Sequence, residues 1–170
     1  MAGVRGDIAL RIDLTHSGTA DLGTPKMRAS VDKILSLVEG TDATNKANLL
    51  FSDTRTIAAS ANENIDLAGT LADAFGATIT AAEIVAIYIA AKAANTNNVN
   101  VTRPASNGFV GPFLAASDGV AIKPGEYALF VSQSGWAVTA GTGDLINIAN
   151  SAGSTGVDYD IIVVARTVAA

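Results

Sequence analysis

Hydrophobic and polar residues alternate in the stretch DIALRIDL, residues 7–14. Every even-numbered residue from Ile8 to Leu14 is apolar, whereas the odd-numbered positions include Arg11 and Asp13. A period of two places the apolar side chains on one side of an extended chain, so the pattern predicts a half-buried β-strand. A loop with Gly18, Gly23 and Pro25 follows it.

The next apolar stretch, SVDKILSLV at residues 30–38, is ambiguous. A helix would gather Val31, Ile34, Leu35 and Val38 on one face, and a strand would alternate less regularly. Glycine and proline precede this stretch, and the turn-rich segment EGTDATNKAN at residues 39–48 follows it. We expect a strand.

The segment ITAAEIVAIYIAAKAA, residues 79–94, carries two opposing signals. Alanine and glutamate favour a helix. β-Branched residues fill four of the six positions from 84 to 89, which favours a strand covered on both faces. We expect a strand, with a helix over residues 81–94 as the alternative.

Short apolar stretches separated by turn residues continue to the end of the chain, at intervals of about ten residues, which is typical of a β-sandwich or barrel. Pro124-Gly125 predicts a type II turn, and residues 161–164 form the continuous apolar run of a covered central strand. Residues 70–80 resemble a helical turn or a loop closing on Gly76. We expect further strands within residues 47–60, 62–69, 99–102, 120–132, 136–140, 144–150 and 158–167.

The chain of 170 residues contains neither an internal repeat nor a Pro/Ser-rich linker, so we expect a single domain. We predict an all-β protein in which residues 1–24 form an N-terminal arm or edge segment and residues 25–170 form a β-sandwich.

The composition of the chain excludes several kinds of functional site. Without cysteine, the chain has no disulfides, thiolate metal sites or thiol nucleophiles, which fits synthesis in a reducing compartment. The net charge is −5 and the arginines are dispersed, so we expect no nucleic-acid groove. Charged residues make up only 16% of the chain, against about 25% in typical proteins. Either other chains cover much of the surface, or it is a solvated surface of small polar residues.

Neither a signal peptide nor a membrane span is expected. The N-terminal segment alternates instead of running apolar. The longest apolar stretch, residues 84–94, includes Tyr88 and Lys92 and is too short to cross a bilayer. We expect a soluble protein.

Candidate chemistry is sparse. His16 is the only histidine, and the chain lacks the G-x-S-x-G motif that would position a serine nucleophile. The segment DATNKAN, residues 42–48, lacks the glycine and glutamate of a calcium loop, and Asp158 and Asp160 would share one side of a strand, most simply facing water. We expect no enzyme activity, no catalytic residues, no metal and no cofactor.

The run Gly141-Thr142-Gly143-Asp144 could be taken for a phosphate-binding loop. It has no P-loop lysine, and the residues that follow, LINIAN at 145–150, alternate as a strand does and not as a helix. We therefore expect a β-hairpin in which the glycines allow a positive φ.

Several segments together resemble a group of small structural proteins of tailed bacteriophages, the capsid decoration, or cement, proteins. They are FSDTRTIAAS, IDLAGTLADAFGATIT, NTNNVNV, GWAVTAGTGDLINIANSAG and DYDIIVV, and the similarity extends from about Asp21 to Val164. All are strand and turn sequences and none is a catalytic signature.

The resemblance implies a jelly-roll-like sandwich that binds the outer capsid surface of the virion after synthesis in the host cytoplasm. Its partners would be the major capsid protein and further copies of itself, as a dimer or trimer. The N-terminal region, with Arg5, Arg11 and Arg28, would contact the capsid and the sandwich would self-associate. The alternative is a tail or fibre module for host attachment.

Overall fold

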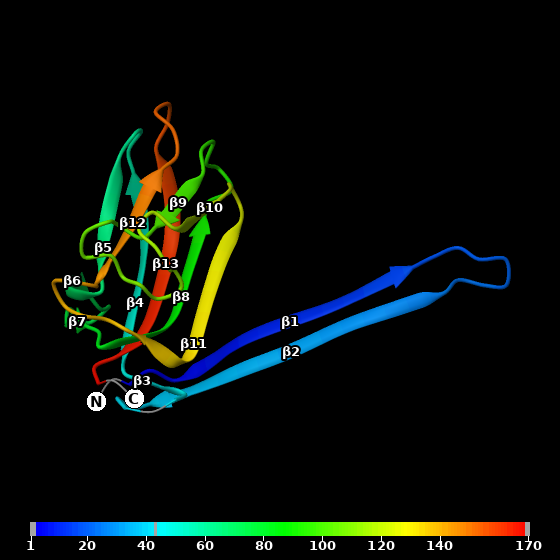
Figure 1. Ribbon diagram of the computed structural model, residues 1–170, viewed down its shortest axis with the longest axis horizontal. Coiled ribbons are helices and arrows are strands. Elements are labelled where there is room, and N and C mark those ends of the chain that lie inside the picture. Colours follow the sequence, from blue (N-terminus) through cyan, green and yellow to red (C-terminus); the bar gives the residue numbers. More distant parts are fainter. Residues whose placement is uncertain (1–2, 43, 169–170) are drawn as a thin grey trace.

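The computed structural model describes residues 3–42 and 44–168, so residues 1–2 of the predicted arm, Ala43 and residues 169–170 lie outside the described residues. The described chain is all-β, and its body consists of two four-stranded antiparallel sheets (Figure 1). The first sheet has the order β11-β8-β13-β4 and the second β10-β9-β12-β5. Their bounds are β4 Leu49–Ile57, β5 Asn62–Asp66, β8 Glu83–Ala91, β9 Val99–Thr102, β10 Gly119–Ile122, β11 Tyr127–Ala137, β12 Leu145–Asn150 and β13 Val157–Arg166.

This strand order is that of a jelly roll, in which eight strands form two Greek keys. In the first sheet, β13 lies between β8 and β4, and in the second, β12 lies between β9 and β5. Each sheet therefore joins strands that are far apart in sequence. The predicted all-β, jelly-roll-like sandwich is confirmed.

The core lies between the two sheets and follows the predicted alternation. In β12, Ile146 and Ile148 are buried, while the alternate residues Leu145 and Asn147 are partly exposed. In β13, Tyr159, Ile161 and Val163 are fully or almost fully buried. These apolar side chains interdigitate from the two sheets and hold the sandwich together.

Within the ambiguous segment at residues 79–94, residues 83–91 form β8, which is flanked by β11 on one side and β13 on the other. Ile87 and Ile89 face the core between the sheets, and Val85 and Ala86 belong to a second, smaller apolar cluster. Tyr88 remains half-buried. The predicted strand is confirmed, because β-branched packing on both faces outweighs the helix propensity of alanine.

Two turns bear on the predictions. At Pro124-Gly125, Gly125 has φ +80° and Glu126 N donates to Lys123 O at 2.9 Å, so the predicted type II turn is confirmed. The segment at residues 70–80 contains no helical turn. The predicted loop is confirmed: Gly76 has φ +84° and its N donates to Asp73 O at 3.0 Å, and the loop joins β6 (Ala68–Ala72) and β7 (Thr78–Thr80) as a small ribbon.

The prediction of a hairpin at residues 141–144 was wrong in one respect. The turn is tight, with Gly141 at φ +75°, but β11 before it and β12 after it belong to different sheets. The turn therefore carries the chain from one layer to the other. Alternation identifies the strands on each side but not the sheet that each joins.

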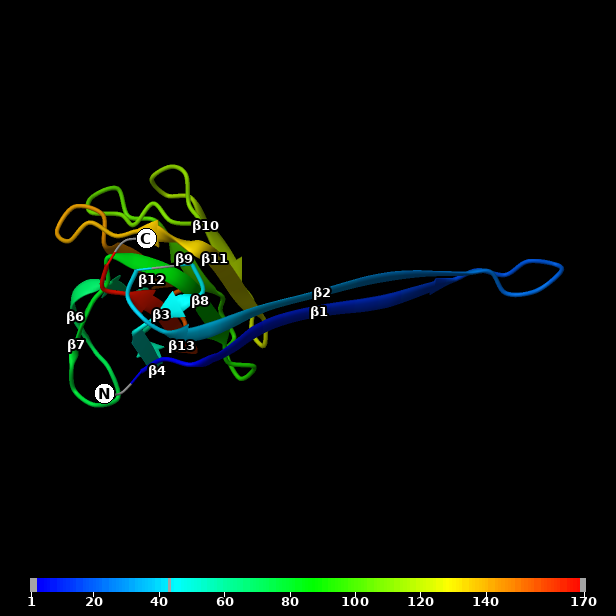
Figure 2. The same cartoon turned by 90° about the horizontal axis from the view of Figure 1, so that it is seen from below.

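A long two-stranded hairpin projects from the base of the sandwich (Figures 1 and 2). Its strands are β1 (Gly6–Ser17) and β2 (Lys26–Glu39), paired over twelve positions, and the end of β2 pairs in parallel with β3 (Lys46–Ala47). The predicted boundary at residues 24 and 25 falls in the tip loop. Residues 25–39 thus belong to the projecting arm and not to the sandwich.

The hairpin is fixed to the first sheet at its base. Leu37 is buried there against Val85, Ala86 and Val164, and Ile8 packs beside it. Beyond this contact β1 is exposed, which corrects the prediction of a half-buried strand. The predicted alternation is present, but no part of the described chain covers its apolar side.

Candidate assembly surface

The register of the hairpin gives it one apolar and one polar face. Residues paired across the two strands point to the same side of the ribbon, and successive pairs alternate between sides. We call the side that continues from Ile8 the apolar ribbon face. Its pairs are Ile8–Leu35, Leu10–Lys33, Ile12–Val31, Leu14–Ala29 and His16–Met27.

This face is open to solvent along most of its length. Leu14 is 64% exposed, Met27 is 65% exposed, and Leu10, Ile12 and Val31 are also exposed. A two-stranded ribbon is marginally stable in water unless a third strand or another element covers its hydrophobic side. The hairpin therefore has the properties of a segment that is completed by a partner.

We call the opposite side the polar ribbon face, and beyond the apolar pair Ala9–Ile34 its residues are charged or hydroxylic. It contains two of the three arginines predicted to contact the capsid. Its pairs are Asp7–Ser36, Ala9–Ile34, Arg11–Asp32, Asp13–Ser30, Thr15–Arg28 and Ser17–Lys26. Arg11 lies opposite Asp32, and Arg28 forms two hydrogen bonds to Asp13, of 2.8 and 2.7 Å. The guanidinium of Arg28 lowers the pKa of Asp13 below its ordinary value. Arg5 precedes β1 and lies 3.8 Å from Glu39, away from this face. The structure thus brings Arg11 and Arg28 onto one ribbon surface and leaves Arg5 at the base.

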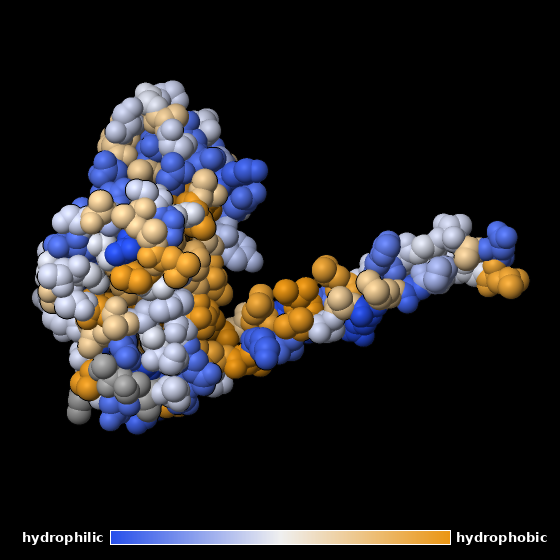
Figure 3. Space-filling view, in the orientation of Figure 1, coloured by the Kyte–Doolittle hydropathy of each residue, from blue (hydrophilic) through white to orange (hydrophobic). Residues whose placement is uncertain are grey.

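The outer face of the first sheet carries a second exposed apolar surface, which the sequence analysis missed. We call it the sheet patch, and apart from Tyr127, which is level with Asp160, it lies in the half of the sheet nearest the hairpin. Figure 3 shows apolar side chains passing from the sandwich onto the near part of the hairpin. The patch consists of Leu50, Tyr88, Tyr127, Leu129, Val131 and Ile162.

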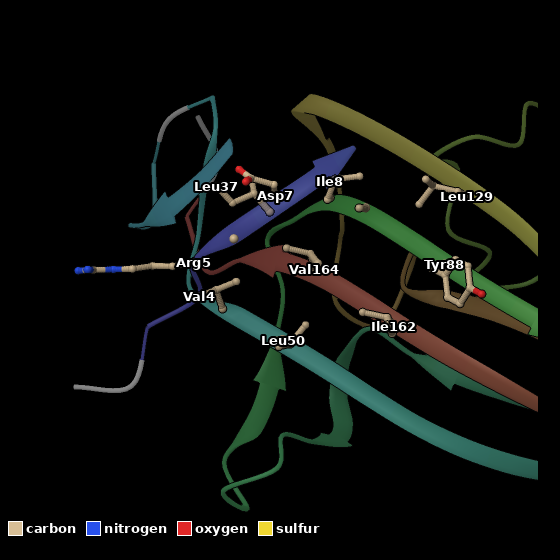
Figure 4. A pocket seen from close by; sticks show the side chains of 12 residues that line it. Val4, Arg5, Asp7, Ile8, Leu37, Leu50, Tyr88, Leu129, Ile162 and Val164 are labelled. Carbon is tan, nitrogen blue, oxygen red and sulfur yellow. The ribbon is translucent and has the colours of Figure 1, made fainter. Parts of the chain in front are cut away.

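The sheet patch and the apolar ribbon face meet at an angle. Where the ribbon leaves the sheet, a cavity of about 260 Å³ lies between Ile8 and Leu37 on the hairpin and Ile162 on the sheet (Figure 4). Further out, the space widens into a groove of about 760 Å³ between Leu10 and Leu129. Lys33 is the one charged residue in the lining of this groove. Arg5 and Asp7 lie at the edge of the inner cavity. The site is thus a recess between two β-surfaces, and its outer groove is apolar and nearly uncharged.

The other half of the same sheet face is polar, and its groups bind one another. Asp160 accepts hydrogen bonds from Lys92 and Thr54, and Thr56 donates to Asp158. The contact with Lys92, and then that with Thr54, lowers the pKa of Asp160 below its ordinary value. Since these groups satisfy each other, this half is suited to contact with water and sets the boundary of the sheet patch.

A pH-dependent contribution to stability follows from Asp160. Because its pKa is lower in the folded chain than the ordinary 3.8, its contribution is complete above that value and is lost as the pH falls through the folded pKa. We expect Asp160→Asn to lower the free energy of unfolding at pH 7 by roughly 0.2–1 kcal/mol, as for other exposed ion pairs.

Urea titrations of both proteins between pH 2 and 7 would measure the effect. The curves for wild type and Asp160→Asn should converge at the acid end. Asp21→Asn, in the tip loop of the hairpin, is the control and should follow wild type throughout. A constant difference between the Asp160→Asn and wild-type curves would contradict the assignment.

The remaining candidate groups do not converge on a catalytic centre. His16 lies on the hairpin opposite Met27, and Asp144 caps the turn through a 2.5 Å hydrogen bond from Gly141 N. Within residues 3–42 and 44–168, no group of three or more His, Cys, Asp or Glu side chains could hold a metal ion. The same part of the chain contains no helix long and apolar enough to cross a membrane.

Comparisons with known proteins add little. No family model matches the chain, and no curated protein matches it. One solved structure with some similarity comes from work described as "Bacillus endospore appendages form a novel family of disulfide-linked pili". It is 14% identical, with a TM-score of 0.35, over 70% of this chain and 89% of that one. The fold itself defines the class: a single jelly-roll sandwich with a projecting amphipathic hairpin.

Proposed function

We propose that this chain is a structural protein of a bacteriophage virion, which decorates the outer capsid surface and stabilises it by bridging major capsid protein subunits. The observation that carries the proposal is the hairpin. A ribbon that extends well beyond the compact body, with an exposed face of arginines and carboxylates, can reach a subunit that the sandwich does not touch. The sequence resemblance to decoration proteins is the reason for proposing the capsid as the surface that the chain binds.

The chain would stabilise the capsid by holding neighbouring subunits together, without any chemical reaction. In an extended strand each residue adds about 3.3 Å, so the twelve residues of β1 span about 40 Å. A sandwich resting on one capsid subunit could thus place its arm on the next. Contacts made only when the subunits have their mature spacing would stabilise that arrangement, because binding favours the state to which it is specific.

We expect removal of the projecting part of the hairpin to abolish binding to purified undecorated phage heads. Replacing residues 10–33 by Asn-Gly keeps Ala9 and Ile34 as the last pair and closes them with a two-residue turn. The contacts of Ile8 and Leu37 with the sheet are retained, so the sandwich should fold normally by circular dichroism. Co-sedimentation with the heads would measure the binding.

The double variant Arg11→Ala/Arg28→Ala isolates the polar ribbon face. It should weaken head binding while keeping the apolar ribbon face intact. Electron microscopy of decorated particles would show where the chain binds. Binding confined to one vertex would support the alternative of a tail or fibre module, and full head binding by the shortened hairpin would refute the role of the arm.

A further inference from the structure

We infer that the recess between the hairpin and the first sheet is occupied by the hairpin of a second copy of this chain. The apolar ribbon face of one copy would pack on the sheet patch of its neighbour. This contact is separate from the capsid contact, which uses the polar ribbon face, and it does not depend on the proposed function.

Exposed apolar side chains are concentrated on these two surfaces. Among the described residues, seventeen large apolar side chains are exposed, and ten of them belong to the two surfaces. Single exposed apolar residues are ordinary, but a contiguous apolar patch marks an interaction site. The ten are Leu10, Ile12, Leu14, Met27 and Val31 on the ribbon, and Leu50, Tyr127, Leu129, Val131 and Ile162 on the sheet.

The chain cannot cover these surfaces by itself. The base of the hairpin is held to the first sheet through the buried Leu37 and through Ile8. From there the ribbon leads away from the sandwich, as the two perpendicular views show (Figures 1 and 2). Leu10 still lines the groove beside the sheet patch, but the described apolar residues from Ile12 to the tip line no part of it.

The dimensions of the two surfaces match. The exposed pairs from Leu10–Lys33 to His16–Met27 cover about 20 Å of ribbon, at about 3.4 Å per residue. Four strands spaced about 4.8 Å apart place the two outer strands of the sheet about 14 Å from each other, so this length of ribbon is sufficient to reach across all four. A ribbon lying across the sheet would thus cover the patch from β11 to β4, in the orthogonal mode of sheet packing.

Charge favours a copy of the same chain over a charged partner. The groove is lined by apolar and uncharged residues apart from Lys33. A basic peptide would lose solvation there without gaining an opposite charge, and an acidic peptide would meet only the one charge of Lys33. The apolar ribbon face has the complementary character, because its side chains are aliphatic except for His16 and Lys33. The stem of a neighbour's Lys33 can lie on Leu129 while its ammonium group remains in water.

Each copy binds its neighbour's recess with its hairpin and receives another hairpin in its own recess. The two copies thus use different surfaces, and the contact is heterologous. Such contacts close into a ring when the rotation between copies permits it. The surface area that one such contact would bury is small for a stable complex. Ring closure, in which every copy makes two contacts, would make assembly cooperative and dependent on concentration.

Sedimentation velocity of the full chain, without phage heads, tests the inference. We expect wild type to form a defined oligomer at micromolar concentration. Leu14→Glu places a charge on the apolar ribbon face and should give a monomer, and Leu129→Glu on the sheet patch should do the same. Thr15→Glu lies at the next position on the polar face and is the matched control that should assemble like wild type. Circular dichroism checks that each variant folds.

The absence of cysteine permits a direct test of the contact. Mild oxidation of Ile12→Cys mixed with a size-tagged Leu129→Cys chain should give a disulfide-linked product of mixed size. Arg11→Cys, on the opposite ribbon face, should not cross-link to the same partner. A monomeric wild type, or equal cross-linking from Arg11→Cys, would overturn the inference. A monomer that still binds heads would assign the apolar ribbon face to the capsid instead.

Discussion

Replacing Glu83 by leucine should lower the free energy of unfolding by about 3–5 kcal/mol, because it would leave the charge of Arg166 buried without its carboxylate. Arg166 is fully buried, and its Nε donates to Glu83 Oε2 at 2.6 Å. Its two Nη atoms donate to Lys46 O and Ser134 O. The guanidinium thus connects the end of β13 to β3 and to β11 at the base of the hairpin.

The matched control removes both charges. Glu83→Leu/Arg166→Met should lose much less stability than Glu83→Leu alone, because neither charge then has to be desolvated. Guanidinium titrations of the wild type, the two single variants and the double variant complete a double-mutant cycle. If the double variant is as unstable as the sum of the single variants, the pair is not coupled and this account of the site is wrong.

The second large effect is expected at Phe109, in the long loop between β9 and β10. Its side chain is fully buried in the main core, and its backbone N donates to Leu145 O at 2.8 Å. Phe109→Ala should lower the free energy of unfolding by about 3–5 kcal/mol, because it removes buried apolar surface and leaves a cavity.

Leu114 supplies the control within the same loop. It is 87% exposed, so Leu114→Ala should change the free energy of unfolding by no more than about 0.5 kcal/mol. Phe109→Leu should lie between the two, since it fills part of the cavity. Urea titrations would measure all three variants, and an equal loss in Phe109→Ala and Leu114→Ala would show that Phe109 does not anchor the loop.

The strands were predictable from local pattern, because the alternation of buried and exposed side chains is a property of each segment by itself. Ile146 and Ile148 in β12 and Ile161 and Val163 in β13 show this clearly. The sequence could not give the partner of each strand. The turn at Gly141 has the composition of a hairpin, yet it connects two sheets, because that choice depends on residues far away in the chain.

The candidate site was predictable only in part. The alternation from Ile8 to Leu14 predicts an apolar side, but the same pattern occurs whether that side is buried in the chain or left for a partner. The sheet patch was missed for a related reason. Ile162 lies in an apolar run that predicts a covered strand, whereas it is 39% exposed because the base of the hairpin packs on Val164 of that face and leaves Ile162 open.

The order of the strands also determines when they can form. Each residue of β4 pairs with one of β13 about a hundred positions later, from Leu49 with Ala165 to Ile57 with Val157. During synthesis on a ribosome, β4 therefore waits without this partner until β13 has emerged, whereas β1 and β2 are close in sequence and can pair early. Contacts between distant residues slow folding. β1 and β2 can pair on a microsecond timescale, but the base of the arm is fixed only when Val85 and Val164 of the first sheet are in place. We expect the closing of the sandwich to be the slow step, during which the apolar residues of β4 are open to chaperones and to aggregation.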